Sequence, residues 1–228
     1  MSRAIPVFAL VPVRALAEGK KRLAPLLAPV ERVALARAML EDVLDGLSRS
    51  PAVEGIAVVT DDDVAAALAA DYRAFVLPDV PEPAIPARRL NASLEAAAAW
   101  ARATRPESAV LILHADLPAA TPEDIAALAA EEAAVVLARA RDGGTNALML
   151  RPGVSLPFAF GADSCARHLA AARVAGLSAA VLERPGLALD LDRPEDIALY
   201  LARAGSSRTL GLLHRLGVPA RIRAGAIP

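Results

Sequence analysis

The sequence predicts a three-layer α/β/α sandwich with a mostly parallel sheet. Short apolar runs, which are typical of buried strands, alternate along the chain with longer segments of helical periodicity. This alternation indicates parallel strands joined by crossover helices that cover both faces of the sheet. The length of 228 residues and the 55% share of hydrophobic residues are enough for one large core. We therefore expect one domain over residues 1–204, followed by a C-terminal helix and tail over residues 205–228.

Strands are predicted where short apolar runs end at proline, glycine or polar residues. In the last of these runs, Leu187–Asp192, leucine and aspartate alternate, which places Asp190 and Asp192 on one face of an extended strand. The runs that predict strands cover residues 5–13, 55–60, 73–77, 108–113, 135–138, 147–150, 179–182 and 187–192.

Helices are predicted from apolar periodicity and from start signals. Thr121 and Pro122 form such a signal, because threonine caps a helix and proline suits its first position. Arg193 and Pro194 begin another helix, and a proline-rich loop over residues 78–86 precedes the helix at Asn91. The remaining helical segments cover residues 30–47, 61–71, 91–103, 163–175 and 209–216.

Three aspartates lie where two predicted strands end. Asp116 follows the run 108–113, and Asp190 and Asp192 close the last run. Ligands of parallel α/β sheets bind beyond the carboxyl ends of the strands, and Mg²⁺ takes carboxylate and phosphate oxygens. Each aspartate alone is explained as a turn cap or a solvated strand end. Together they predict a Mg²⁺ site for phosphate chemistry, because clustered carboxylates repel one another unless a cation offsets them.

A basic loop follows the first strand and contains Lys20, Lys21 and Arg22. Its functional interpretation is a triphosphate site held by charge-assisted hydrogen bonds. The structural alternative is a solvated surface loop, and the two readings are evenly balanced on the residues alone. The position directly after the first strand favours the phosphate site.

Two glycine-containing loops offer neutral donors. The loop Asp142–Asn146 is a turn whose glycines allow close backbone approach to an anion, while Thr145 offers a hydroxyl. Gly161 and Ser164 open a helix whose N-terminal amides favour a phosphate or carboxylate, with Arg167 and His168 as nearby cationic donors, although a lone histidine is more often structural. A plain hairpin and ordinary helix capping by Asp163 or Ser164 remain the structural alternatives.

Composition excludes several classes of function. A formal charge of −1 and an aromatic share of 3% argue against a nucleic-acid partner. No apolar stretch is long enough to span a bilayer, so no membrane partner is expected. The single cysteine, Cys165, excludes an intramolecular disulfide and is typical of a reducing compartment. We expect a cytoplasmic enzyme.

Taken together, these motifs resemble the CofC/FbiD guanylyltransferases. The Gly-Gly-Thr-Asn-Ala-Leu and Phe-Gly-x-x-Ser-x-x-x-His elements are specific, and the resemblance extends to about Leu201. The matching segments are Val11–Val13, Lys20–Leu23, Asp116–Pro118, Asp142–Leu148, Phe160–His168 and Asp190–Asp192.

The resemblance implies a nucleotidyltransferase (MobA-like) fold and transfer of GMP from GTP to a three-carbon phospho-acid in coenzyme F-420 biosynthesis. The implied acceptor is 2-phospho-L-lactate, phosphoenolpyruvate or 3-phosphoglycerate. A homodimer and hand-off of the product to the next pathway enzyme are further implied partnerships. The roles that the resemblance implies are Mg²⁺ binding by Asp116, Asp190 and Asp192, nucleotide binding by Arg14, Lys20, Arg22 and Asn91, and acceptor binding by Thr145, Gly161 and Ser164.

The expected mechanism is in-line attack of an acceptor phosphate oxygen on the α-phosphorus of GTP. Lys20 and Arg22 are the catalytic cations that neutralise charge together with the metal. Two departures from the family concern Arg14, where relatives often have lysine, and Arg88-Arg89, where relatives usually have glycine ahead of Leu-Asn. The alternatives are a related nucleotidyltransferase acting on a sugar phosphate or molybdopterin, and a nucleotide-binding regulatory module without turnover.

Overall fold

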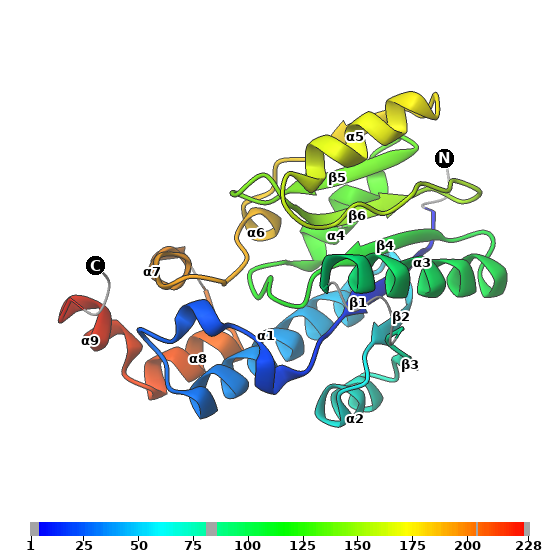
Figure 1. Ribbon diagram of the computed structural model, residues 1–228. Coiled ribbons are helices and arrows are strands. Elements are labelled where there is room, and N and C mark those ends of the chain that lie inside the picture. Colours follow the sequence, from blue (N-terminus) through cyan, green and yellow to red (C-terminus); the bar gives the residue numbers. More distant parts are fainter. Residues whose placement is uncertain (1–4, 81–85, 204, 226–228) are drawn as a thin grey trace.

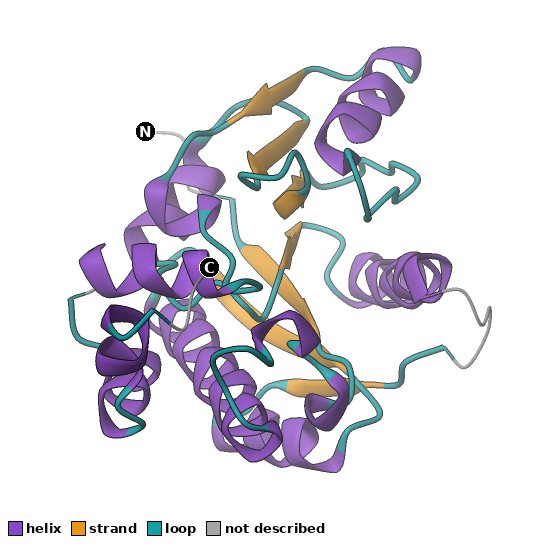
Figure 2. Ribbon diagram, turned by 60° about the vertical axis from the view of Figure 1, so that its left-hand side comes forward, coloured by secondary structure: helices purple, strands orange, loops and turns teal. Residues whose placement is uncertain are grey.

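The computed structural model describes residues 5–80, 86–203 and 205–225. A seven-stranded sheet with the order β3-β2-β1-β4-β6-β5-β7 forms the centre of the molecule, with helices on both of its faces (Figures 1 and 2). The strands are β1 (Val7–Pro12), β2 (Val53–Val59), β3 (Phe75–Leu77), β4 (Ala109–Leu113), β5 (Val135–Arg139), β6 (Thr145–Leu150) and β7 (Ala179–Val181). The predicted three-layer architecture is confirmed.

The helices surround this sheet and continue beyond it. Two short 3₁₀ turns, η1 (Leu16–Glu18) and η2 (Lys21–Leu23), lie in the loop after β1. The α-helices are α1 (Pro29–Arg49), α2 (Asp63–Asp71), α3 (Pro86–Thr104), α4 (Pro122–Ala130), α5 (Ser164–Val174), α6 (Pro185–Ala188), α7 (Pro194–Arg203), α8 (Arg208–Arg215) and α9 (Val218–Arg223). In the part of the chain that the structure describes, no helix is both long and apolar enough to cross a membrane.

The sheet is parallel except around β6. β1 pairs in parallel with β2 and β4, whereas β6 is antiparallel to both β4 and β5. The connection between β5 and β6 covers only residues 140–144, which is too short for a crossover helix. β6 therefore returns beside β5 and brings Thr145 close to the carboxyl end of β4.

Each face of the sheet carries its own apolar layer. Alternating strand residues such as Ala9 and Leu111 face α1, α2 and α4, whereas Phe8 and Val110 face α3 and α5. Burying these side chains contributes about 25 cal/mol for each Å² of apolar surface removed from water. The two layers fix β1 and β4 as neighbours, and this pairing positions the loops that follow them.

The segment Leu187–Asp192 is not a strand, which corrects the prediction. Leu187 belongs to the short helix α6, which begins at Pro185, and residues 189–192 follow as an extended loop. Leu189 and Leu191 are buried, whereas Asp190 and Asp192 are partly exposed, so the predicted alternation of faces persists. The Leu191 amide donates to the Asp116 carbonyl over 3.1 Å, and this bond ties the loop to the end of β4.

Helix α3 begins earlier than predicted. It starts at Pro86 instead of Asn91, because proline is favoured at the first position of a helix and alanine, arginine and leucine then propagate it. Part of the predicted proline-rich loop, residues 81–85, lies outside the described residues. Arg89 consequently sits in the first turns of α3, where its guanidinium pairs with Asp61 (3.3 Å) and Asp79 (2.8 Å).

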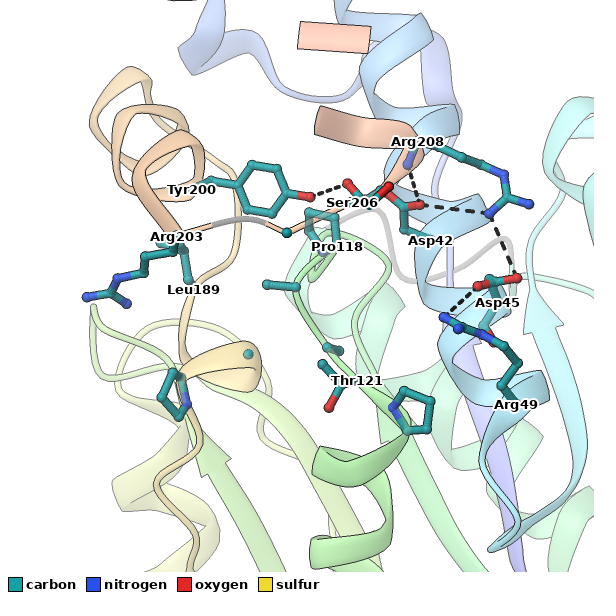
Figure 3. Close-up of a pocket in the computed structure, with 17 residues that line it drawn as sticks. Asp42, Asp45, Arg49, Pro118, Thr121, Leu189, Tyr200, Arg203, Ser206 and Arg208 are labelled. Carbon is teal, nitrogen blue, oxygen red and sulfur yellow. Dashed lines mark hydrogen bonds and ion pairs between the residues drawn. The ribbon is translucent and has the colours of Figure 1, made fainter. Parts of the chain in front are cut away.

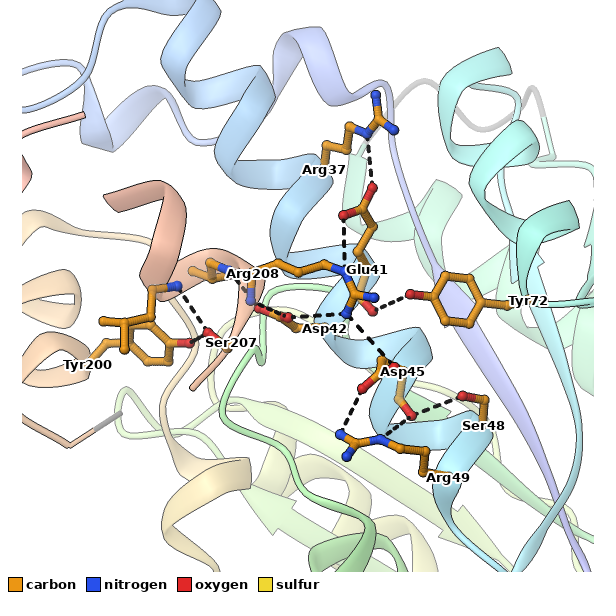
Figure 4. A network of polar contacts seen from close by, with 12 residues as sticks. Arg37, Glu41, Asp42, Asp45, Ser48, Arg49, Tyr72, Tyr200, Ser207 and Arg208 are labelled. Atoms are coloured by element: carbon orange, nitrogen blue, oxygen red, sulfur yellow. Dashed lines mark hydrogen bonds and ion pairs between the residues drawn. The ribbon is translucent and has the colours of Figure 1, made fainter. Parts of the chain in front are cut away.

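Helix α8 packs alongside α1 (Figure 1). The Asp42 carboxylate on α1 accepts hydrogen bonds from the Arg208 and Thr209 amides at 2.9 and 2.8 Å, which caps α8 from outside (Figure 4). Ser207 caps α8 as well and bonds the Tyr200 hydroxyl at 2.6 Å. Beyond the predicted last helix at residues 209–216, the C-terminal tail contains helix α9, which the sequence did not predict.

Candidate active site

The loops after β1 and β4 meet at one edge of the sheet and enclose a cavity of about 390 Å³. Parallel pairing of β1 with β4 brings their carboxyl ends together, as the sequence predicted. The cavity is lined by residues that include Arg14, Lys20, Leu90, His114, Asp116 and Asp192. Several of the predicted site residues are thus gathered around one space.

Lys20 is the centre of the charged cluster. Its ammonium lies 2.6 Å from Asp116 Oδ2 and 3.7 Å from Asp192 Oδ1, and its side chain is 11% exposed. The backbone of Lys20 is left-handed, with φ of 56°, a conformation that is uncommon for residues with a Cβ. The chain adopts it as it enters η2, and the charge-assisted pair with Asp116 holds the side chain in place.

Arg22 and Asn146 hold the other two aspartates. Arg22 Nη1 donates to Asp192 Oδ2 over 2.7 Å, although the Arg22 side chain is largely exposed. The Asn146 amide donates to the Leu187 carbonyl (2.9 Å) and to Asp190 Oδ1 (3.3 Å). Asn146 therefore fixes the loop that carries Asp190 against β6, a role that the sequence analysis missed.

The pKa values follow from these pairs. Burial lowers the pKa of the Lys20 ammonium, but the charge and hydrogen bond of Asp116 outweigh it, so the pKa is raised. Burial likewise opposes ionisation of Asp116, and the Lys20 charge holds the pKa of that carboxyl below its usual value. Burial and the neighbouring charge of Asp116 raise the pKa of Asp190. Of these three groups, only Asp190 is disfavoured in its charged form.

These contacts bear on the predicted metal site. Among the described residues, no three His, Cys, Asp or Glu side chains are grouped closely enough to hold a metal ion by themselves. Lys20 supplies the cation that offsets the clustered carboxylates in this structure. Within this charged cluster, Asp116 Oδ1 is shielded from solvent and accepts no hydrogen bond from any described residue.

A further residue positions the loop after β1. Asp62 Oδ2 accepts the Leu16 amide at 2.9 Å, and Asp62 Oδ1 caps α2 by accepting the Val64 and Ala65 amides. One carboxylate thereby joins the loop that carries Lys20 to the start of α2. The sequence signals only its capping role, because the Leu16 contact spans 46 residues.

The two glycine-containing loops meet at three buried side chains. Ser164 Oγ donates to Thr145 Oγ1 over 3.1 Å, and Thr145 Oγ1 lies 3.1 Å from His168 Nδ1. His168 Nε2 accepts the Ala159 amide at 2.9 Å, so the neutral ring carries its proton on Nδ1 and donates it to Thr145. We name this set the hydroxyl cluster: Thr145, Ser164 and His168.

Of the two interpretations of His168, the structure supports the structural histidine and not the cationic donor. Burial, together with the charges of Arg167 and His114, lowers the pKa of His168 to about 4, so the ring is neutral near pH 7. Helix capping by Asp163 or Ser164 is also wrong, because the Asp163 side chain caps nothing and Ser164 bonds Thr145 instead. Thr145 and Ser164 are 3% and 1% exposed. Neither hydroxyl is therefore open to solvent, whereas Gly161 and Arg167 are exposed.

Gly161 adopts a φ of +127°, which side chains with a Cβ rarely reach. The preceding residue is clamped by Asn91, whose Oδ1 accepts the Phe160 amide (2.8 Å) and whose Nδ2 donates to the Phe160 carbonyl (3.3 Å). Asn91 thus orients the loop from Phe160 to the start of α5 at Ser164, which we call the Gly161 loop. Its predicted contact with the nucleotide stays a prediction.

A larger cavity, of about 900 Å³, lies elsewhere, between α1, the loop after β4, α6 and the end of α7 (Figure 3). Two of its three arginines pair with aspartates: Arg49 lies 2.7 Å from Asp45, and Arg208 lies 3.8 Å from the same residue. No predicted site residue lines it. The smaller cavity beside Lys20 is therefore the candidate active site.

The sequence matches the family described as guanylyl transferase CofC like over residues 7–226. The chain belongs to this family. A 3-phospho-D-glycerate guanylyltransferase from Phenylobacterium zucineum is 42% identical over 205 residues, covering 88% of this chain and 91% of that protein. A phosphoenolpyruvate guanylyltransferase from Conexibacter woesei is 37% identical over 222 residues, covering 92% and 96% of the two chains. The family resemblance stated from the motifs is confirmed.

Solved structures share the fold. A Desulfovibrio desulfuricans protein assigned to the nucleotide-diphospho-sugar transferases superposes with a TM-score of 0.76 at 20% identity, covering 96% of this chain and 97% of that one. A 4-diphosphocytidyl-2C-methyl-D-erythritol synthase gives a TM-score of 0.53 at 20% identity, covering 87% and 97%. This CofC-like chain therefore has a nucleotidyltransferase fold.

Proposed function

We propose that this protein transfers GMP from GTP to a three-carbon phospho-acid and releases pyrophosphate. The observation that carries the proposal is the position of Lys20, which is held by Asp116 and Asp192 at the edge of the 390 Å³ cavity. Family membership and relatives named for this reaction support it. The site gathers the charges that phosphoryl chemistry requires.

In the proposed reaction, an acceptor phosphate oxygen attacks the α-phosphorus of GTP in line. A new phosphorus–oxygen bond forms, the bond from the α-phosphorus to the bridging oxygen of the β-phosphate breaks, and pyrophosphate leaves with that electron pair. The attacking phosphate is already anionic, so no general base is required. Lys20 and Arg22 neutralise and orient the triphosphate, and catalysis rests on position and charge.

A Mg²⁺ ion fits the residues present. Asp116 Oδ1 is a buried oxygen without a partner among the described residues, and Asp190 is destabilised in its charged form by burial and by the charge of Asp116. Mg²⁺ commonly uses one or two carboxylates together with phosphate oxygens, so a complete protein cage is not required. Asp116, Asp190 and Asp192 would hold the ion, which would neutralise charge on the reacting phosphates.

The remaining parts of the proposal concern the pathway, the cell compartment, the oligomeric state and the acceptor. Membership of the CofC-like family supports a place in coenzyme F-420 biosynthesis, with the product handed to the next enzyme of that pathway. We further propose a cytoplasmic homodimer. The relatives support two acceptors, since guanylyltransferases named for 3-phospho-D-glycerate and for phosphoenolpyruvate both resemble this chain, at 36–42% identity.

The deciding experiment measures pyrophosphate release from GTP and Mg²⁺ with 3-phosphoglycerate, phosphoenolpyruvate or 2-phospho-L-lactate. We expect release only when both an acceptor and Mg²⁺ are present, with formation of the GMP adduct. GTP binding without release under every condition would favour a regulatory module. Release with a sugar 1-phosphate or molybdopterin, and with none of the three acids, would favour a related nucleotidyltransferase.

A further inference from the structure

His114 lines the candidate active site, and its ring nitrogen Nε2 has no hydrogen-bond partner within the described chain. It follows β4 and lies two residues before Asp116, and its amide donates to the Asn146 carbonyl over 3.2 Å. His114 lines the 390 Å³ cavity together with Leu90. His114 Nε2 is shielded from solvent and makes no hydrogen bond to any described residue.

Aromatic contacts fix the place of this ring. The His114 and Phe160 rings lie 5.3 Å apart between centroids, and Phe160 contacts His168 of the hydroxyl cluster at 4.9 Å. Phe160 is itself clamped by Asn91. His114 therefore stands between the Lys20 cavity, where the nucleotide is proposed to bind, and the Gly161 loop, where the acceptor is proposed to bind.

A buried polar atom without a partner is unfavourable and calls for an explanation, and pairing with a bound substrate provides one where the atom belongs to a residue that lines a cavity. The groups common to all three acceptors are a phosphate and a carboxylate, and the cations and backbone amides of the site already suit those anions. An imidazole nitrogen between the apolar side chains of Leu90 and Phe160 suits an uncharged partner, since a hydroxyl can donate to it or accept from it.

We propose that His114 is a specificity-determining residue that hydrogen-bonds a hydroxyl group of the acceptor. This inference rests on the proposed function. Of the three acceptors, 3-phosphoglycerate carries a free hydroxyl on C2, whereas phosphoenolpyruvate and 2-phospho-L-lactate carry none. The protein is accordingly a 3-phosphoglycerate guanylyltransferase by preference. Discrimination arises because a site built to pair a substrate hydroxyl rejects analogues that leave its own polar group unpaired.

The test compares kcat/KM for 3-phosphoglycerate and phosphoenolpyruvate in the wild type, His114→Phe and His114→Gln. Phenylalanine keeps the ring and its packing on Phe160 but removes both nitrogens, whereas glutamine restores a polar group at a similar reach. We expect the wild type to prefer 3-phosphoglycerate. His114→Phe should lower kcat/KM for that acceptor about ten- to a hundred-fold, with phosphoenolpyruvate changed less than about three-fold. His114→Gln should recover part of the preference, and KM for GTP should stay unchanged.

The outcomes separate this inference from the function on which it rests. If the wild type transfers GMP to none of the acids, the proposed function fails. If it transfers GMP but prefers phosphoenolpyruvate, or if His114→Phe leaves the ratio of the two acceptors unchanged, the proposed function stands and the role of His114 is wrong. A rise confined to KM for GTP would assign the nitrogen to the nucleotide and would likewise overturn the proposal.

Discussion

Replacing Thr145 by valine removes one hydroxyl while nearly preserving the shape of the side chain. In the folded protein, Thr145 Oγ1 accepts from Ser164 Oγ and from His168 Nδ1, both at 3.1 Å. The Ser164 hydroxyl is free to rotate after the substitution. The His168 ring is held by the Ala159 amide on its other nitrogen, so its buried N–H loses its acceptor.

The size of the effect follows from that single orphaned donor. A buried donor left without a partner costs about 1–3 kcal/mol in the free energy of unfolding. For a chain of this size, 1 kcal/mol shifts Tm by about 2–4 °C, so we expect a fall in Tm of roughly 2–12 °C. The Gly161 loop loses its anchor to β6, and KM for the acceptor should rise while KM for GTP stays within about two-fold of wild type.

The measurements are thermal unfolding and steady-state kinetics with each substrate varied separately. Thr145→Ser is the matched control, because it keeps the hydroxyl and loses only a methyl group. It should retain the acceptor KM and most of the stability. A Thr145→Val protein with wild-type Tm and wild-type acceptor KM would show that the hydroxyl cluster neither stabilises the fold nor positions the acceptor loop.

Four further predictions address the remaining parts of the site. Asp190→Asn and Asp116→Asn should each lower turnover by orders of magnitude, and near-normal GMP transfer would remove that residue from the proposed metal site. Tm should stay nearly unchanged in Asp190→Asn but fall in Asp116→Asn, which leaves the buried Lys20 ammonium without its nearest carboxylate. GTP should exceed ATP in acceptor-dependent kcat/KM, and equal values would refute a preference for guanine. Ser164→Ala should raise the acceptor KM more than the GTP KM, because the loop that carries Gly161 loses the hydrogen bond from Ser164 to Thr145, and an effect confined to the GTP KM would show that this loop does not bind the acceptor. The pKa of His168 is lowered to about 4 in the folded protein, so the full free energy of unfolding should be present above the unfolded pKa near 6.5. The free energy of unfolding should then fall by up to about 3 kcal/mol as the pH is lowered from about 6.5 to about 4. An equal fall in a His168→Gln variant would show that another group titrates.

The layers of the fold and the family could both be predicted from the sequence. Apolar periodicity and start signals such as Thr121-Pro122 depend on near neighbours along the chain, so they predicted most helices and strands. The motifs gave the family for the same reason, since each is a short run of residues. The alternation in Leu187–Asp192 correctly separated buried leucines from exposed aspartates, although the segment is no strand.

The tertiary structure alone decided which groups meet. Lys20 and Asp116 are 96 residues apart, and Arg22 and Asp192 are 170 apart, so their ion pairs depend on how β1, β4 and the loop after α6 close on one another. The direction of β6 depends on its short connection to β5 and on its place beside β4. The lack of a partner for His114 Nε2 among the described residues also depends on the tertiary structure. Whether a buried polar atom finds a partner is settled by packing from several elements, and no local pattern records it.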